Sequence, residues 1–310
     1  MPQPLLHIGY HKTGSTWLQN HLFVREDAGF VVPFDRKTTL NRAIVEPYPL
    51  TFDAAAARAA LRPDVEAAIE QGKVPVITSE ALCGGDTSGG YQSKELADRL
   101  HAVFPDGKVL IIIREQRSMI LSSYSMYLRG GGLLRLKDYL DLPRFPHAIP
   151  FFSLEFFEYD HLIAYYQNLF GPERVLVLPY EMFAREPDRF AGEILRFSGA
   201  KEITGLPFDA RPKKMWPAFS VALRRYMNPF FDRVVQNGYS WMCPDVRMRY
   251  VSNWFFWRVV NPNAPEGLSQ RIETGWKARI AARVRGIYAK SNRRTAGLIG
   301  RDLSTYGYDV

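Results

Sequence analysis

The sequence predicts an α/β fold with three layers, α/β/α, in which a central parallel β-sheet has helices on both faces. Short apolar runs alternate with longer segments of helical character over the first two thirds of the chain. Strands of a parallel sheet are buried on both faces, so they are apolar throughout instead of alternating with polar residues. Helices between such strands are typical of α/β domains.

Four apolar runs are the predicted strands, and each precedes a turn and a predicted helix. The strands cover residues 5–9, 74–78, 108–113 and 174–178, and the helices cover residues 16–22, 93–103, 118–128 and 187–197. The Ala-rich segment 54–69 predicts a further helix. We expect Pro63 to break or restart this helix, because proline has no backbone N–H to donate.

The C-terminal third differs from the rest of the chain in its pattern. After about residue 211 the strand signal fades, and basic, aromatic, mainly helical segments continue to residue 300. The sequence contains no internal repeat and no low-complexity linker. We therefore expect a single domain over residues 1–310, with residues 211–301 as its basic, mainly helical C-terminal portion.

The basic residues are concentrated in that portion. The chain has 40 Lys and Arg against 32 Asp and Glu, a net charge of +8, with 46% hydrophobic and 23% charged residues. This is a globular composition, which excludes a disordered or fibrous chain. Residues 211–301 hold 18 Lys and Arg against four Asp and Glu, a net charge of +14. This excess predicts an anionic ligand, an anionic polymer or a membrane surface as a partner.

The small number of cysteines and the short apolar segments disfavour a disulfide-rich, a zinc-binding or a membrane-spanning protein. Cys83 and Cys243 are too few for a disulfide framework and fit no zinc spacing. Two unrelated thiols are predicted, with a single Cys83–Cys243 bridge as the alternative. No segment reaches the roughly 18 apolar residues of a membrane-spanning helix. The most apolar window, residues 254–257, is flanked by Arg249 and Arg258 and predicts core or interface. No secretion signal is recognised before the first strand, so we expect a cytoplasmic protein.

The first predicted turn has the features of a phosphate-binding loop. Gly9 and Gly14 have the G-x-x-x-x-G spacing of P-loop proteins, and a strand precedes and a helix follows them. Free N–H groups and the dipole at a helix N-terminus favour an anion there. Ser15 and Thr16 follow the second glycine, where an NTPase has Lys-[ST], and the lysine lies inside the loop as Lys12. The fold is thus predicted to be P-loop-like, but the loop suits a shorter anion than a triphosphate.

A second anion site is predicted at the end of the third strand. Arg114 is the first residue after the apolar run 109–113, and Ser122 follows eight residues later. Ligands of open α/β sheets bind at this edge, and arginine makes bidentate contacts with phosphate. The strand ends in arginine where an NTPase has an aspartate, which disfavours a metal-bound triphosphate. The two sites suit a nucleotide with a diphosphate-like 5′ group and another phosphate elsewhere.

At these residues the chain resembles the bacterial sulfotransferases that use 3′-phosphoadenosine-5′-phosphosulfate (PAPS). Residues 12–17, Lys-Thr-Gly-Ser-Thr-Trp, are similar to their 5′-phosphosulfate loop, and Arg114 and Ser122 have the spacing of their 3′-phosphate pair. Residues 174–181 with 197–199, and the tail from Tyr288 to Tyr308, resemble further stretches of this family. Residues 36–61 and 137–155 have no counterpart in the resemblance and are expected to be specific to the acceptor.

The resemblance implies a role for each residue of the loop. Lys12 would contact the bridging and sulfuryl oxygens as the S–O bond breaks, without a metal. Backbone N–H groups from Thr13 through Gly14 to Thr16 would hold the 5′-phosphate, with hydroxyl groups of Ser15 and Thr16. Trp17 matches a position whose ring stacks on adenine, and packing against the sheet is the alternative.

The reaction also requires a base for the acceptor hydroxyl. Glu80 follows the second strand at the same edge as the loop, and glycan sulfotransferases use a glutamate on the equivalent segment, so Glu80 is the first candidate. His11, beside Lys12, is the competing base or transition-state donor. His7 lies within the strand and is expected to be a packed, hydrogen-bonded histidine. Lys214, in the basic run 211–214, resembles a segment that closes over the nucleotide.

Three functions compete on these observations. The first is PAPS-dependent transfer of a sulfuryl group to a hydroxyl of a glycan or glycolipid, in which the basic portion helps to bind an acidic acceptor. The second is an ATP-dependent P-loop kinase, which the absence of GK[ST] disfavours. The third is a non-catalytic protein that binds polyanions or a membrane surface. Nucleic acid is not an expected partner, because no nucleic-acid-binding motif accompanies the charge.

Overall fold

The computed structural model describes the chain except for residues 86–88, 144–148, 211–215 and 232–247. The described residues form two compact units. Unit 1 comprises residues 1–115, 155–212 and 288–310, and unit 2 comprises residues 116–154 and 213–287. The border does not coincide with residue 211, since unit 2 also contains residues 116–154. The single domain expected from the sequence stays a prediction.

Unit 1 is built on a five-stranded parallel sheet with the strand order β2-β3-β1-β4-β5. The strands are β1 (Leu5–His7), β2 (Phe30–Val31), β3 (Val74–Thr78), β4 (Lys108–Ile113) and β5 (Val175–Pro179). Strand β1 is central, with Leu6 paired to Ile77 of β3 and to Val109 of β4. Because all strands are parallel, their carboxyl ends meet at one edge of the sheet.

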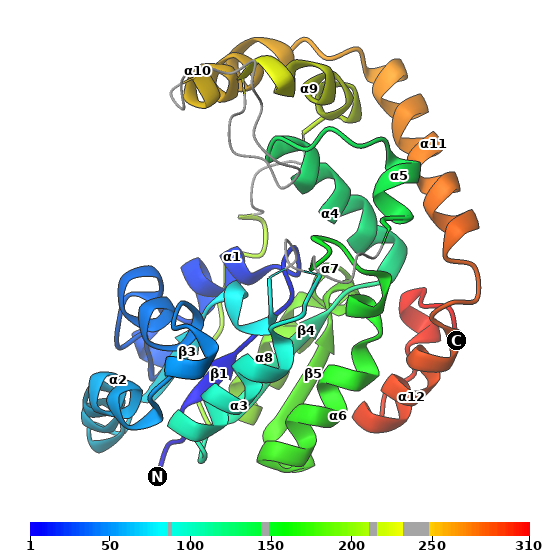
Figure 1. Cartoon of the computed structure of the whole chain (residues 1–310). Coiled ribbons are helices and arrows are strands. Elements are labelled where there is room, and N and C mark those ends of the chain that lie inside the picture. The colour runs from blue at the N-terminus through cyan, green and yellow to red at the C-terminus, as the bar shows by residue number, and fades with distance from the viewer. Residues whose placement is uncertain (86–88, 144–148, 211–215, 232–247) are drawn as a thin grey trace. The chain divides into compact units, whose positions relative to one another are not determined.

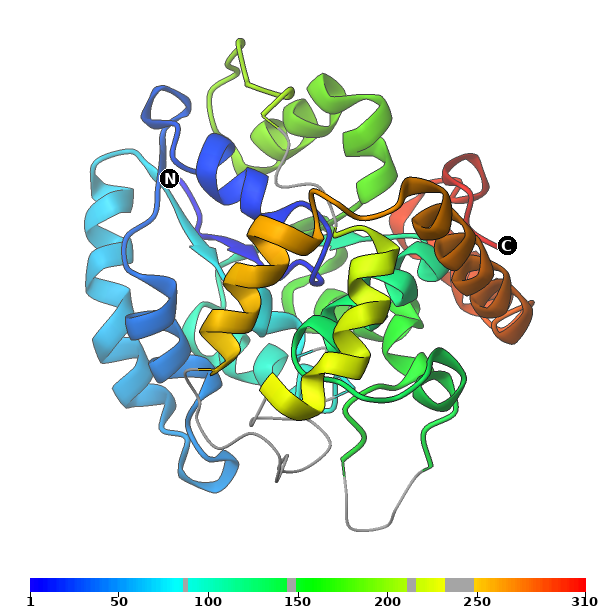
Figure 2. The same ribbon diagram turned by 90° about the horizontal axis from the view of Figure 1, so that it is seen from above.

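Helices cover both faces of this sheet. The helices of unit 1 are α1 (Ser15–Trp17), α2 (Ala54–Glu70), α3 (Ser93–Val103), α6 (Tyr159–Phe170), α7 (Tyr180–Arg185), α8 (Pro187–Ser198) and α12 (Ala289–Ile299). Helices α2, α3 and α6 lie side by side along one face (Figure 1). Figure 2 shows α1 and α8 on the opposite face. The connection from β1 to β2 crosses the sheet in one direction, and the later connections between strands cross it in the other. Right-handed crossovers in opposite directions place their helices on opposite faces of the sheet.

The predicted α/β fold with a parallel sheet is confirmed. Strands β3 and β4 and helix α3 have the predicted bounds. Strand β2 was not predicted, since two residues are too short for a periodic signal. The expected break at Pro63 is wrong: α2 is continuous, with Pro63 inside it on an exposed position. An exposed position lets water satisfy the carbonyl that proline leaves without a donor.

Unit 2 consists of helices. They are α4 (Gln116–Arg129), α5 (Leu136–Leu140), α9 (Ala218–Phe231), α10 (Met248–Phe255) and α11 (Glu266–Arg283). The helical C-terminal portion is thus confirmed for the described residues, although α12 belongs to unit 1. In the window predicted to be core or interface, Phe256 is buried, whereas Trp254 and Trp257 are 61% and 42% exposed. None of the helices in the described ranges is long and apolar enough to cross a membrane.

The N-terminal end of α2 provides a test of its local stability. Asp53 accepts hydrogen bonds from the amides of Ala55 and Ala56 at 2.8 and 3.1 Å. We expect Asp53→Ala to lower the free energy of unfolding by about 1 kcal/mol, the usual effect of losing an N-cap. The matched control is Asp64→Ala at an exposed position within the same helix, where alanine is the better helix former. Thermal denaturation followed by circular dichroism compares them, and equal midpoints for both variants would contradict the capping role.

Candidate active site

The loop after β1 begins the candidate site at the carboxyl edge of the sheet. Lys12 has a φ of 66°, and it is the one non-glycine residue with positive φ in the described chain. The Thr13 hydroxyl donates to the Tyr10 carbonyl and closes the turn. A Cβ atom on Gly9 would lie 2.7 Å from Nε2 of His7, so only glycine fits there. The chain therefore turns sharply at the end of the central strand.

The turn leads into a helix N-terminus whose donors are unoccupied. Gly14 has a φ of 88°, and its carbonyl accepts from the amides of Trp17 and Leu18. Within the described residues, no acceptor bonds the backbone amides of residues 13–16. The Ser15 hydroxyl is buried and also lacks a hydrogen-bond partner in the described chain. Buried polar groups are normally satisfied, so these donors indicate an anion site.

Arg114 ties the end of β4 to this loop. Its Nη1 donates to the Lys12 carbonyl at 3.0 Å, and its Cζ lies 5.0 Å from the centre of the Tyr180 ring. A Cβ on Gly14 would approach Cε2 of Tyr180 to 3.3 Å, so the same ring also lies against the loop. Arg114 is thus held against the same turn that carries Lys12.

A carboxylate at the end of β5 holds the backbone beside Arg114. Glu181 accepts from the Glu115 amide at 3.0 Å and from the Tyr308 hydroxyl at 3.2 Å. The Tyr159 hydroxyl donates to the Arg114 carbonyl at 2.6 Å. Burial raises the pKa of Glu181, against the hydrogen bonds that lower it. These contacts fix the direction of the chain as it leaves β4.

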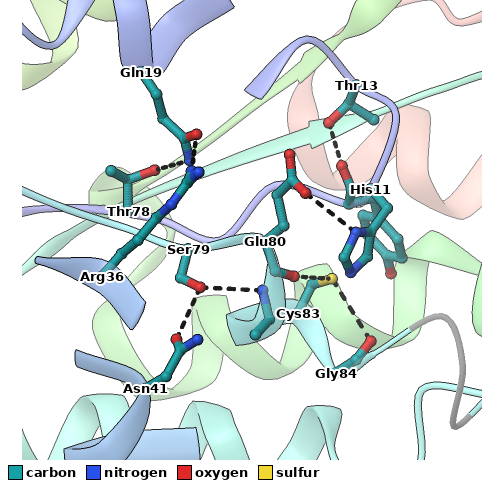
Figure 3. A network of polar contacts seen from close by, with 12 residues as sticks. His11, Thr13, Gln19, Arg36, Asn41, Thr78, Ser79, Glu80, Cys83 and Gly84 are labelled. Carbon is teal, nitrogen blue, oxygen red and sulfur yellow. Dashed lines mark hydrogen bonds and ion pairs between the residues drawn. The ribbon is translucent and has the colours of Figure 1, made fainter. Parts of the chain in front are cut away.

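Glu80 and His11 form a polar pair next to the loop (Figure 3). The Glu80 Oε2 atom lies 3.3 Å from Nδ1 of His11, and both side chains are partly exposed. The hydrogen bond from His11 lowers the pKa of Glu80, burial opposes this, and the charge of Lys12 lowers it further. Glu80 begins a short 3₁₀ helix, in which the Ser79 hydroxyl accepts from the Ala81 amide at 3.3 Å. Glu80 is therefore an ionised group on a fixed support.

His7 belongs to a buried chain of hydrogen bonds below this pair. Its Nδ1 is 2.8 Å from the Thr78 hydroxyl, which also accepts from the Gln19 amide at 3.0 Å. Arg36 donates to the Gln19 side-chain oxygen. Burial lowers the pKa of His7 to about 4, although Glu80 raises it, so His7 is neutral at pH 7. His7 is the packed, hydrogen-bonded histidine that the sequence predicts.

Trp17 packs into an aromatic cluster of unit 1. It is 1% exposed, and its Nε1 donates to the Pro207 carbonyl at 3.1 Å. Its ring is stacked on Phe208 at 5.2 Å and tilted against Phe183 at 4.8 Å. In this conformation Trp17 therefore packs against rings outside the sheet, and both stacking on adenine and packing against the sheet stay predictions.

Comparison with known proteins finds one family model and several solved structures that are similar to this chain. The chain is similar to the solved structure of a sulfotransferase from Alicyclobacillus acidocaldarius, with 16% identity, a TM-score of 0.47 and 99% of each chain covered. It is also similar to a sulfotransferase domain from the curacin biosynthetic pathway, with 14% identity, a TM-score of 0.39, and 92% and 98% covered. No curated protein matches. Residues 92–203 match the sequence model of the Sulfotransferase family. This match covers about a third of the chain and includes Arg114 and Ser122, but it does not include the loop after β1.

The structure brings together most of the site residues that the sequence predicts. The side chains and amides around the loop come from Lys12, Arg114, His11, Glu80 and residues 13–16, all in unit 1. Ser122 is buried in α4 of unit 2, so its pairing with Arg114 stays a prediction. Lys214 and Cys243 lie outside the described residues. Cys83 is buried, and its Sγ donates to the Glu80 carbonyl at 3.2 Å.

Sequence reasoning missed three residues that support the site. Tyr180 lies under Arg114, and Glu181 and Tyr308 hold the backbone of residue 115. Tyr180 and Glu181 directly follow a buried strand. The carboxyl ends of parallel strands share an edge, so this position could have predicted that both residues lie near the site. Tyr308 carries no such signal, since it is 127 residues from its partner in sequence.

The strain of the loop at Gly14 can be tested directly. We expect Gly14→Ala to lower the free energy of unfolding by about 1–2 kcal/mol, because an L-residue is strained at this positive φ. The new methyl group would also press on Tyr180. The control is Gly297→Ala in α12, where nothing lies within 4 Å and alanine stabilises a helix by up to about 1 kcal/mol. Denaturant unfolding measures both, and a Gly14→Ala variant as stable as the control would contradict the assigned strain.

Proposed function

We propose that this sulfotransferase transfers the sulfuryl group of PAPS to a hydroxyl group of a glycan or glycolipid. The observation that carries the proposal is the group of unoccupied donors at the start of α1, beside Lys12. Four consecutive amides and a buried hydroxyl without acceptors suit an anion with several oxygens. Lys12 lies in the loop after β1 and is exposed, so its side chain can reach the sulfuryl group of the bound donor.

The proposed reaction is an in-line transfer. The acceptor oxygen forms a bond to sulfur while the bond from sulfur to the phosphate oxygen breaks, and the hydroxyl proton passes to a base. The products are a sulfate ester and 3′-phosphoadenosine-5′-phosphate (PAP). Such a transfer depends mainly on positioning and on stabilising charge on the leaving group. Lys12 and the amides of residues 13–16 supply that stabilisation, so the proposal assigns no role to a metal.

Glu80 is the proposed base, and His11 is the alternative. The ion pair and Lys12 keep Glu80 ionised at neutral pH, which is the state that accepts a proton. The same hydrogen bond orients the His11 ring. In the alternative, His11 is the base and Glu80 holds its ring in position. With either base, the proton acceptor is near Lys12, the proposed cation that stabilises the leaving group.

The remaining contacts of the donor complete the proposal. Arg114 has a fixed guanidinium group beside the loop, which suits a phosphate, and Ser122 is its proposed partner for the 3′-phosphate. Trp17 and Lys214 are the proposed contacts of the adenine ring and the nucleotide. The net charge of +14 over residues 211–301 supports an acidic acceptor. We also retain a cytoplasmic location as a proposal.

Binding of PAP tests the donor site without knowledge of the acceptor. We expect calorimetry to detect PAP binding, and Lys12→Ala to abolish sulfuryl transfer to a panel of glycans, lipids and phenols. Loss of one transition-state donor typically lowers the rate about 100- to 1,000-fold. Lys73→Ala, at a partly exposed position just before β3, is the control.

Two results would overturn this function. Tighter binding of ATP with Mg²⁺ than of PAP would favour a kinase. Salt-sensitive binding of an anionic polymer that survives Lys12→Ala, without any PAP binding, would favour a non-catalytic protein.

The pH dependence of transfer distinguishes the two candidate bases. Because its pKa is lowered, Glu80 stays ionised from neutral pH down to below the ordinary glutamate value of about 4.3. If Glu80 is the base, the rate is level through this range and falls only below it, and Glu80→Gln lowers the rate about 100-fold or more. A fall near pH 6.5, the ordinary histidine value, would assign the base to His11. Glu70→Gln, an exposed carboxylate at the end of α2, is the control.

A further inference from the structure

Unit 2 contains a cavity that the proposed reaction does not use. It has a volume of about 550 Å³ and lies among helices α4, α9 and α11, which contact one another. This volume is within the range of small-molecule sites, about 300–1,000 Å³. All of its lining residues belong to unit 2, so the cavity is defined without reference to the donor loop.

The walls of the cavity are largely apolar. Leu128 and Tyr124 come from α4, Leu223 from α9, and Ile272 and Trp276 from α11. Tyr124 and Trp276 meet edge to face at 5.3 Å and form one corner. Leu128 and Tyr124 are buried, whereas Ile272 and Trp276 are partly exposed to the cavity and to solvent. A surface of this kind gains free energy when an apolar group covers it.

Four arginines also line the cavity, and no carboxylate does so among the described residues. They are Arg135, Arg225, Arg271 and Arg279. In the described chain none of the four forms an ion pair, whereas neighbouring cations such as Lys277 and Arg283 pair with Glu273 and Asp141. Arg225 lies over the Tyr226 ring at 4.4 Å, which holds it at the cavity. The charge of this cavity is therefore positive and uncompensated.

We propose that this cavity binds a single-chain amphiphile, an apolar chain with one anionic head group such as a phosphate, sulfate or carboxylate. The apolar walls accept the chain, and the arginines bind the head group with charge-assisted hydrogen bonds. A free anion would leave the walls in water, and a neutral amphiphile would leave the arginines without a counterion. Only a ligand with both parts uses both features of the cavity. The inference does not depend on PAPS or on sulfuryl transfer.

The first experiment compares matched probes on the full chain by calorimetry, below their micelle concentrations. Decyl phosphate is expected to bind at least tenfold more tightly than decyl glucoside and than inorganic phosphate. Binding is expected to weaken from decyl to hexyl phosphate by about fourfold for each fully buried methylene, which corresponds to about 0.8 kcal/mol. Higher salt should weaken decyl phosphate more than decyl glucoside, because only one of them is charged.

The second experiment locates the binding by filling the cavity. Gly275 of α11 lines the cavity, and a Cβ there meets no atom within 4 Å. Gly275→Leu should therefore fold, be at least as stable as the parent because leucine is the better helix former, and lose decyl phosphate binding. Gly267→Leu is the matched control, since Gly267 also lies in α11 with open space around it and does not line the cavity.

The third variant tests the head-group contacts. Replacing two exposed arginines of the cavity together, Arg271→Gln with Arg279→Gln, should weaken decyl phosphate binding at least tenfold and leave decyl glucoside unchanged. Arg285→Gln, an exposed arginine of unit 2 outside the cavity, should have no effect.

The proposal is overturned by equal binding of the charged and neutral probes. It is also overturned by binding that survives Gly275→Leu, or by binding to vesicles of anionic lipid without any binding of decyl phosphate. PAP binding reports on the donor site separately.

Discussion

The candidate site depends on one hydrogen bond, from the Arg114 guanidinium to the backbone carbonyl of Lys12. This bond joins the end of β4 to the loop after β1, and it brings the Arg114 guanidinium group to the turn that carries Lys12. Lys12 has a positive φ, a conformation that costs a non-glycine residue about 1–2 kcal/mol and that persists only where neighbouring contacts impose it. The Thr13 hydroxyl and the Tyr180 ring provide the other contacts of the turn.

Several contacts distant in sequence maintain that bond. Glu181 and Tyr159 fix the backbone where the chain leaves β4, and Tyr308 near the C-terminus bonds the Glu181 carboxylate. Next to the loop, His11 hydrogen bonds to Glu80, and this bond lowers the pKa of the Glu80 carboxyl. A lysine, an arginine and a carboxylate are thus arranged around one turn.

Local patterns in the sequence predicted the features that local forces determine. The apolar run 109–113 predicted β4 because a strand buried on both faces is made of apolar residues. Gly9 and Gly14 predicted the turn because other residues do not fit there. The continuous helix through Pro63 was not predicted, since its tolerance depends on exposure in the folded chain. The roles of Glu181 and Tyr308 were also missed, because their contact joins residues far apart in sequence.

Hydrogen exchange of the full chain with and without PAP tests the central claim most directly. The claim is that the backbone amides of residues 13–16 are donors to the anionic part of the nucleotide. These amides lack acceptors in the described chain, so they are expected to exchange rapidly without ligand. On PAP binding their exchange should slow markedly, while the exposed surface of α2 remains unchanged. Binding of PAP with no protection of residues 13–16 would contradict the account.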